Sequence, residues 1–126
     1  MIYLLITSVL FSQGIPYGQE FQVNTYTYYN QLQPFMICTN KNFVITWEDD
    51  YHDGSGWGVF GQILDSKCNK IGTEFQINTH TQYGQLDRSL APFNTGGFIA
   101  CWTSWKQNNT PYTNIFSQIF DSLGNK

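Results

Sequence analysis

Short apolar runs alternate with polar stretches rich in glycine and asparagine along most of the chain. The two most apolar runs are residues 43–47 (FVITW) and 98–102 (FIACW), in which nearly every position is apolar or β-branched. Runs of this length favour strands over helices, and a continuous apolar run is typical of a strand buried on both faces.

The remaining apolar stretches follow the same order in two halves of the chain. Turns rich in Asn, Asp and Gly separate them. No helical period is present after residue 12, so the sequence predicts an all-β fold. The predicted strands span residues 34–39, 43–47, 57–64, 70–78, 89–93, 98–102 and 114–120.

An internal repeat organises this pattern. The sequence GQEFQVNT at residues 18–25 returns as GTEFQINT at residues 72–79, with six of eight positions identical. The chain therefore contains two units of about 54 residues. We assign residues 18–70 to the first unit, with a leading outer strand at residues 20–25, and residues 72–126 to the second.

Four strands joined as a meander, repeating every 54 residues or so, are typical of a β-propeller blade. We therefore predict two blade-like antiparallel units, in which each sheet packs against a neighbour on both faces. A β-sandwich of two sheets fits the same strand pattern and is the alternative fold.

The second unit ends after its third predicted strand. Residues 20–25, which precede the other strands of the first unit, have the sequence of a fourth strand. Two blades cannot close a ring, since propellers typically contain four to eight. The chain could assemble as a homo-oligomer, belong to a longer protein with further blades, or pair its two sheets without a ring. We expect a fragment of a longer repeat protein.

Composition narrows the classes of partner. The chain is 17% aromatic and only 12% charged, with a net charge of −3 and six basic residues that are never clustered. Nucleic-acid binding demands a basic patch, so we expect no nucleic-acid partner.

Residues 1–14 resemble a secretory signal peptide, with an apolar run too short to span a bilayer. We expect a secreted or cell-surface protein without a stable membrane span. A hydrophobic strand, or an uncleaved weak anchor, is the alternative for this segment. Asn108 begins the one N-glycosylation sequon, which would matter only on a secreted route.

The three cysteines, Cys38, Cys68 and Cys101, form no CxxC motif and lie at non-equivalent places in the two units. A disulfide framework would be expected to repeat with the units. We interpret the cysteines mainly as packing thiols and leave one disulfide pair open.

The recurring motifs GxEFQ[VI]NT, F[VI]xxW, DGSGWGVFGQILD and NKIG resemble a tandem-repeat family of long secreted or surface proteins of bacteria and ciliates. The resemblance covers residues 18–126, although DGSG at residues 53–56 becomes NNTP at residues 108–111. It implies a β-propeller-like extracellular module and brings no catalytic residues.

Residues 49–56 form the densest polar cluster. Carboxylates at alternate positions before a glycine turn are typical of calcium loops, and Asp49 and Asp53 have that spacing. Tyr51 stands where a further ligand would be expected, so the more economical interpretation is a solvated loop, and no cofactor is predicted. His52 and His80 lack a third ligand at a zinc-site spacing.

Aromatic residues lie in or beside the two long loops at residues 48–56 and 103–111. Such residues often form binding faces for carbohydrate or protein, although they could also cap the ends of the sheets. The candidates for ligand binding are Tyr51, Trp57, Trp105 and Tyr112.

The sequence thus favours a structural or binding repeat module without catalytic activity. The alternative is part of a carbohydrate-active propeller enzyme, because Glu48, Asp49, Asp50 and Asp53 could supply an acid and a base. The polar residues of the repeated motif, Asn24 and Asn78 among them, are expected to bond neighbouring backbone at a strand end.

Overall fold

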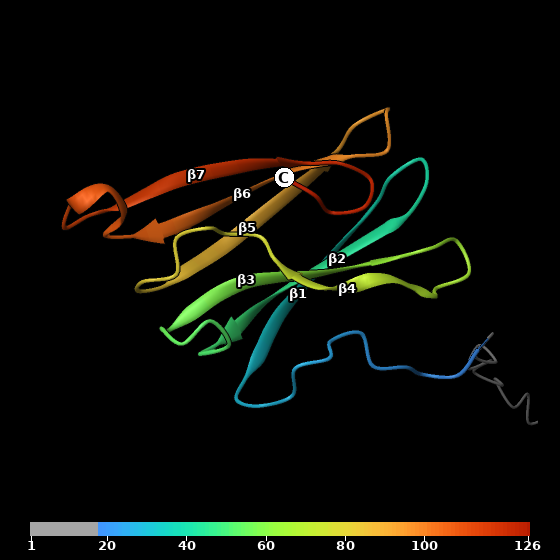
Figure 1. The fold of residues 1–126 in the computed structure, drawn as a ribbon, viewed down its shortest axis with the longest axis horizontal. Coiled ribbons are helices and arrows are strands. Elements are labelled where there is room, and N and C mark those ends of the chain that lie inside the picture. The colour runs from blue at the N-terminus through green and yellow to red at the C-terminus, as the bar shows by residue number, and fades with distance from the viewer. Residues whose placement is uncertain (1–17) are drawn as a thin grey trace, which may run out of the picture.

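The computed structural model describes residues 18–126, which form seven strands in two antiparallel meander sheets (Figure 1). The all-β prediction is confirmed. A 3₁₀ turn, η1 (Gln107–Asn109), lies between the last two strands. The first sheet contains β1 (Gln31–Cys38), β2 (Phe43–Asp50), β3 (Trp57–Leu64) and β4 (Lys70–Gln76), and the second contains β5 (Gln85–Pro92), β6 (Phe98–Trp105) and β7 (Thr113–Phe120).

The two sheets pack face to face, as Figure 1 shows, with the core between them. Aromatic rings fill part of it: Phe98 and Phe120 stack 4.8 Å apart, and Phe75 approaches Phe120 at 6.0 Å. This two-layer arrangement agrees with the sandwich alternative, whereas the propeller arrangement stays a prediction. The buried core residues are Val44, Val59, Ile63, Ile77, Leu90, Phe98, Ala100, Trp102 and Phe120.

The central strand of the first sheet is buried on both faces, as its continuous apolar run predicts. Val44 and Thr46 point to the face that meets the second sheet, which we call the inner face. Trp47 alternates to the opposite, outer face and is also buried. The outer face is partly covered by the chain that precedes β1.

Strands β2 and β6 run about three residues further than the sequence predicts. Glu48 and Asp49, expected in a solvated loop, are strand residues only 6% and 0% exposed. Charged residues oppose burial unless they are paired, and each of these two carboxylates has a partner far away in sequence. Arg88 on β5 pairs with Glu48, and Gln31 on β1 donates to Asp49.

The two units share their strand register. In the first sheet Val44 lies opposite Ile63, and in the second Ile99 lies opposite Ile119. Each first strand of a unit also has an irregularity at the same place, where Gln33 and Asp87 both have a φ of 54°. The repeat in sequence is therefore a repeat in structure down to individual backbone angles.

Asn78, at the end of the repeated motif, joins the two sheets. Its side-chain oxygen accepts a hydrogen bond from the Val59 amide at 2.8 Å. Its side-chain nitrogen donates to the carbonyl of His80 at 2.8 Å and to the side chain of Gln85 at 3.0 Å. The expected bonding of this Asn to nearby backbone is confirmed.

Asn24, in the first copy of the motif, makes the same donations. Its side-chain nitrogen lies 2.7 Å from the carbonyl of Tyr26 and 3.3 Å from Oε1 of Gln31. The connection into β1 thus has the shape of the connection into β5. Residues 20–25 themselves form no strand, because their backbone pairs with none of the strands within residues 18–126.

The cysteines are all unpaired. Cys38 and Cys68 are exposed, so their interpretation as packing thiols is wrong, while Cys101 is half-buried. Cys38 lies at the end of β1, and Cys68 occupies a left-handed turn position with a φ of 65°, where neither side chain meets the core. Within residues 18–126 no helix is long and apolar enough to cross a membrane, and the predicted signal peptide lies outside the described residues.

A buried ion pair links the two sheets. Nη1 of Arg88 lies 2.9 Å from Oε1 of Glu48, and both side chains are almost fully enclosed. Burial lowers the pKa of Arg88, and the charge of Glu48 partly offsets that shift. The Asp87 amide donates to the same carboxylate oxygen at 3.0 Å.

Removing one partner would leave a buried charge without compensation. We expect Arg88→Met to lower the free energy of unfolding by about 3 kcal/mol, measured by urea denaturation. The double variant Glu48→Leu/Arg88→Met should recover most of that loss, because it buries no charge. Equal destabilisation of the single and double variants would contradict this account.

The turns that follow β3 and β7 are built on an aspartate. The carboxylate of Asp65 accepts from the amides of Lys67 and Asn69, each at 2.8 Å, and from the Asn69 side chain at 2.9 Å. These bonds, the Asn69 side chain first, lower the pKa of Asp65. The corresponding bonds from Asn125 and Leu123 lower the pKa of Asp121.

A carboxyl group whose pKa is lower in the folded chain stabilises the fold above its unfolded pKa of about 3.9, and the contribution is lost as pH falls towards the folded value. We expect Asp65→Asn/Asp121→Asn to be less stable than the parent at neutral pH and to depend less on pH below 4 or so. Urea titrations across this range measure both effects. Asp87→Asn, at an exposed carboxylate, is the control. If the free energy of unfolding of the double variant fell with pH as steeply as that of the parent, the role given to the two turn carboxylates would be wrong.

Candidate functional site

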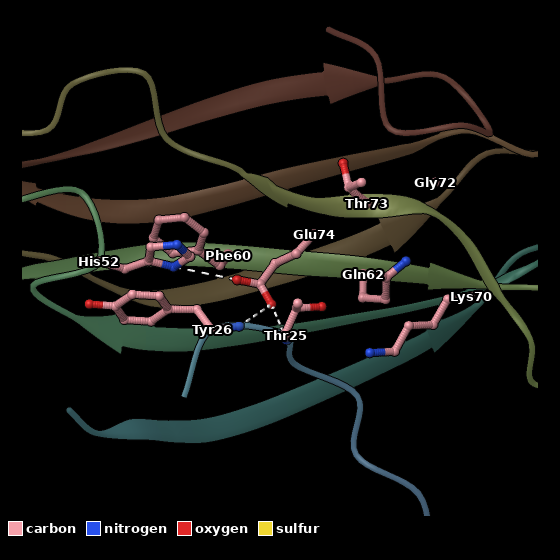
Figure 2. A pocket seen from close by; sticks show the side chains of 9 residues that line it. All are labelled: Thr25, Tyr26, His52, Phe60, Gln62, Lys70, Gly72, Thr73 and Glu74. Carbon is pink, nitrogen blue, oxygen red and sulfur yellow. Dashed lines mark hydrogen bonds and ion pairs between the residues drawn. The ribbon is translucent and has the colours of Figure 1, made fainter. Parts of the chain in front are cut away.

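The outer face of the first sheet carries a groove of about 510 Å³ between the sheet and the chain preceding β1 (Figure 2). Its walls come from three parts of the sequence that lie far apart. The lining residues are Thr25, Tyr26, His52, Phe60, Gln62, Lys70, Gly72, Thr73 and Glu74.

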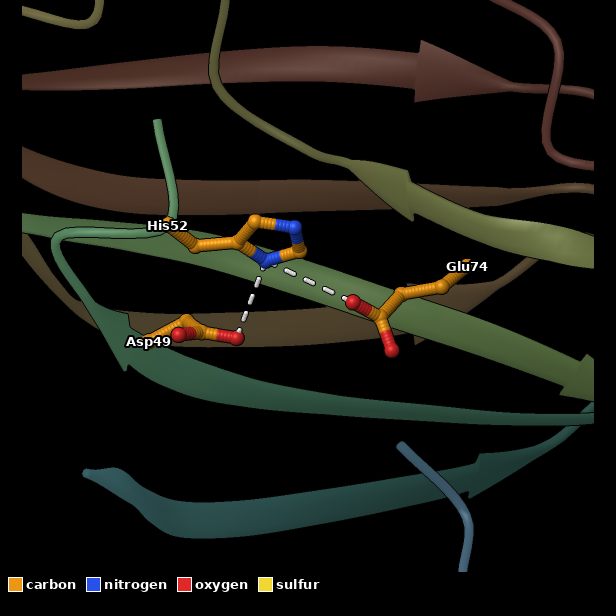
Figure 3. Close-up of side chains that lie close together, drawn as sticks. All are labelled: Asp49, His52 and Glu74. Carbon is orange, nitrogen blue, oxygen red and sulfur yellow. Dashed lines mark hydrogen bonds and ion pairs between the residues drawn. The ribbon is translucent and has the colours of Figure 1, made fainter. Parts of the chain in front are cut away.

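Two carboxylates and an imidazole meet at one end of this groove (Figure 3). Nδ1 of His52 lies 3.1 Å from Oδ2 of Asp49 and 3.4 Å from Oε1 of Glu74. Carboxylate oxygens accept hydrogen bonds, so Nδ1 must carry the hydrogen and donate it. His52 comes from the loop after β2, whereas Asp49 and Glu74 come from β2 and β4.

The other bonds of these carboxylates are made within the protein. Asp49 accepts from Nε1 of Trp47 and from Nε2 of Gln31, each at 3.2 Å. Glu74 Oε2 accepts from the amide of Thr25 at 2.6 Å. Glu74 therefore holds the chain that precedes β1 against the sheet, across 49 residues of sequence.

The imidazole of His52 is also held by stacking. It lies between the rings of Tyr26, 3.8 Å away with an interplanar angle of 4°, and Phe60, 4.1 Å away at 14°. Burial, followed by the charge effects of Tyr29 and Asp49, raises the pKa of Tyr26. The sandwich of three rings fixes the position of residue 26 on the outer face.

The cluster of Asp49, His52 and Glu74 offers one nitrogen and two oxygens within 4.8 Å of one another, a donor set that a divalent transition metal accepts. In this structure Oδ2 of Asp49 and Oε1 of Glu74 contact Nδ1 of His52, while the second oxygen of Glu74, Oε2, accepts from the Thr25 amide. The arrangement therefore acts as an anchor for the preceding chain, which we call the N-terminal anchor.

The two residues with calcium-like spacing do not meet in a common site. Asp49 belongs to the N-terminal anchor, whereas Asp53 accepts from Nε2 of Gln76 at 2.6 Å and from the Ser55 amide at 3.1 Å. Sequence reasoning missed the link of Glu74 with His52. The repeated Glu was treated as a strand-end residue, and nothing in the sequence shows that β4 lies beside the loop after β2.

The aromatic candidates lie at one end of the two sheets, where β1, β3, β5 and β7 begin (Figure 1). Tyr51, Trp105 and Tyr112 are exposed there, and Trp57 is half-buried at the start of β3. Three further tyrosines, not predicted, are exposed at the same end. We call this set the aromatic end: Tyr28, Tyr29, Tyr51, Tyr83, Trp105 and Tyr112.

The repeat also places side-chain pairs at the aromatic end. The rings of Tyr29 and Tyr51 approach at 5.8 Å, and at the equivalent place Nζ of Lys106 lies 4.9 Å from the centre of the Tyr83 ring. All four residues have a φ between 55° and 65°. Left-handed backbone is uncommon outside glycine and clusters at functional positions.

A second groove, of about 440 Å³, lies beside η1 at this end. Asn108 and Asn109 in its wall also have left-handed backbone. Amide, hydroxyl and aromatic groups dominate the wall, which contains His80, Gln82, Tyr83, Lys106, Asn108, Asn109, Thr110 and Pro111.

Comparison of the chain with protein-family models, with curated proteins and with solved structures found no match. The suspected repeat family therefore stays a prediction from the motifs alone. The arguments about function that follow depend on the geometry of this chain.

The N-terminal anchor gives a direct test. Replacing Glu74 by Ala removes the acceptor for the Thr25 amide, a charge-assisted hydrogen bond. We expect hydrogen exchange at Thr25 and Tyr26 to become about ten- to a hundredfold faster. Glu20→Ala is the matched control, because Glu20 is the exposed counterpart of Glu74 in the first copy of the motif. Equal exchange in the two variants would contradict the anchor.

Proposed function

We propose that this chain is a non-catalytic repeat module of the cell exterior that binds carbohydrate at its aromatic end. The observation that carries the proposal is the concentration of exposed Tyr and Trp side chains at one end of the sheets. Exposed apolar residues scattered singly need no explanation, but a cluster of them marks a binding surface.

The neighbours of these rings favour a sugar over a charged ligand. A sugar ring offers an apolar face that stacks on an aromatic side chain, and hydroxyls that bond to amides. Asn108, Asn109 and Thr110 supply such groups beside Tyr83 in the second groove. Lys106 is the one cation in that wall, and it lies over the Tyr83 ring.

The absence of catalysis in this proposal is supported by how three of the four candidate carboxylates are bonded. A glycosidase needs two carboxyl groups that face the scissile bond. Glu48 pairs with Arg88, Asp49 belongs to the N-terminal anchor, and Asp53 bonds to Gln76. No observation among the described residues favours the alternative of a carbohydrate-active enzyme.

The location outside the cell is supported by the sequence of residues 1–14 and by the resemblance to surface repeat proteins. The low charge and high aromatic content agree with a surface that binds neutral ligands. Determining the amino-terminal residue of protein secreted by a host cell would test this part of the proposal.

Substitution of the rings tests the ligand face. We expect the parent protein to bind at least one of cellohexaose, chitohexaose, mannohexaose and maltohexaose in calorimetric titrations. Trp105→Ala and Tyr112→Ala should each weaken that binding by about tenfold, the value of one stacked ring.

Phe93→Ala is the control, because Phe93 is exposed at the opposite end of the second sheet. If both aromatic variants bound as tightly as the parent, or if Phe93→Ala weakened binding equally, the aromatic end would not be the binding surface. Failure to bind any of the four oligosaccharides would count against carbohydrate and leave a protein ligand as the alternative.

A further inference from the structure

Equivalent positions in the two sheets differ sharply in exposure. Val59 and Ile63 on β3 are 0% and 1% exposed, because the second sheet covers the inner face of the first. Their counterparts on β7, Ile115 and Ile119, are 73% and 57% exposed. The second sheet therefore presents to solvent the face that the first sheet buries, and we call it the open face.

A complementary difference is found on the outer face of the first sheet. Met36 on β1 is 59% exposed, whereas its counterpart Leu90 on β5 is 8% exposed and packs in the core. Phe21, the counterpart of Phe75, is also exposed, while Phe75 packs against the core. Exposed apolar side chains thus lie on the open face of the second sheet and on the part of the outer face of the first sheet that the preceding chain leaves uncovered. These are the two faces that point away from the contact between the sheets (Figure 1).

The backbone shows the same pattern. The edge of β3 that faces away from β2 pairs with β4, so that Gly61 lies opposite Phe75 and Phe60 opposite Gln76. The corresponding edge of β7, which faces away from β6, has no strand beside it within residues 18–126. Residues 20–25, which repeat the sequence of the strand that completes the first sheet, lie on the far side of the molecule from β7 (Figure 1).

We propose that a second copy of this chain covers the open face, in the same way that the second sheet covers the inner face of the first. Residues 18–23 of one copy pair with the edge of β7 of the next copy. The copy that supplies residues 18–23 also packs the outer face of its first sheet on Ile115 and Ile119 of the other copy. This association is independent of the proposed carbohydrate binding and leaves the aromatic end free.

The internal packing of the two sheets is the template for this interface. By the register of β3 with β4, Phe21 of one copy lies opposite Ser117 of the other, and Gln22 opposite Phe116. The Ile115 amide of one copy then donates a hydrogen bond to Oδ1 of Asn24 in the other copy, as the Val59 amide donates to Oδ1 of Asn78 within each chain. Asn24 already holds the connection into β1 in the required shape.

The absence of charge at two key positions agrees with the same packing. The internal interface contains the buried pair of Glu48 with Arg88. The residues in the corresponding places at the proposed interface are Thr103 and Pro34. Both are neutral, so the proposed interface has no charge at the two places where the internal interface buries an ion pair.

The two surfaces differ, so the contact is head-to-tail. Such a contact produces a closed ring if the rotation between copies closes and an open filament if it does not. An unpaired strand edge beside apolar side chains is also a recognised site of association.

Disulfide crosslinking tests the register. Directly opposed residues in an antiparallel pair have Cα atoms about 4.5–5.5 Å apart, within the reach of a disulfide. In a background with Cys38, Cys68 and Cys101 replaced by Ser, the pair Phe21→Cys and Ser117→Cys should form a ladder of covalent oligomers on mild oxidation. Gln19→Cys with Ser117→Cys is the matched control, shifted by two positions, and should crosslink poorly.

The mass in solution tests the surface. We expect the parent chain to form species larger than a monomer as its concentration rises, measured by light scattering after size-exclusion chromatography. Ile115→Lys should raise the dissociation constant by about a hundredfold, because it places a charge on buried apolar surface. Ser66→Lys, which adds the same charge to an exposed turn of the first sheet, should leave the mass unchanged.

A monomer at every concentration tested, without crosslinking, would overturn the proposal. A symmetric dimer through two β7 edges would overturn it as well. In that case Ile115→Lys would lower the mass, but the pair at residues 21 and 117 would not crosslink.

Discussion

The need to cover both faces of each sheet governs this structure. The apolar runs at residues 43–47 and 98–102 place side chains on both faces of a central strand, and leaving an apolar face in water is unfavourable. The first sheet meets that need with the second sheet on one side and, over part of the other side, with the anchored chain before β1. The second sheet has one face covered by the described residues, and the exposure of Ile115 follows from that difference.

Polar residues of the repeated motif set how one sheet follows the next. Asn78 and Gln85 are almost wholly buried, yet their amide groups bond to backbone and to each other. A buried amide tolerates little displacement, because an unmet donor or acceptor costs about 1–3 kcal/mol. Asn24 and Gln31 form the same connection before β1. Sheet-to-sheet geometry is therefore encoded locally in each repeat.

The sequence predicts well what depends on local pattern and poorly what depends on distant partners. Alternation, turns and the repeat are sufficient for the all-β class and for most strand positions. The burial of Glu48 could not be predicted, because its partner Arg88 is 40 residues away and only the packed sheets bring them together. The contact of Glu74 with Thr25 was missed for the same reason. Tyr51 and Tyr112 are exposed, as expected of residues in or beside the long loops, whereas the exposed Tyr83 was not predicted because its turn offers no comparable signal.

The same constraint explains why the proposed ligand face lies at an end of the sheets. The faces of the sheets take part in packing and their edges in strand pairing. The strand ends and their loops are therefore the surface that can change in sequence without disturbing either kind of contact. The two units differ most in those loops, where residues 53–56 (DGSG) stand against residues 108–111 (NNTP). The backbone at that end is also strained at Tyr83 and Lys106, where left-handed angles orient the side chains. Variation in sequence, strain and exposed aromatic rings thus coincide where packing makes the fewest demands.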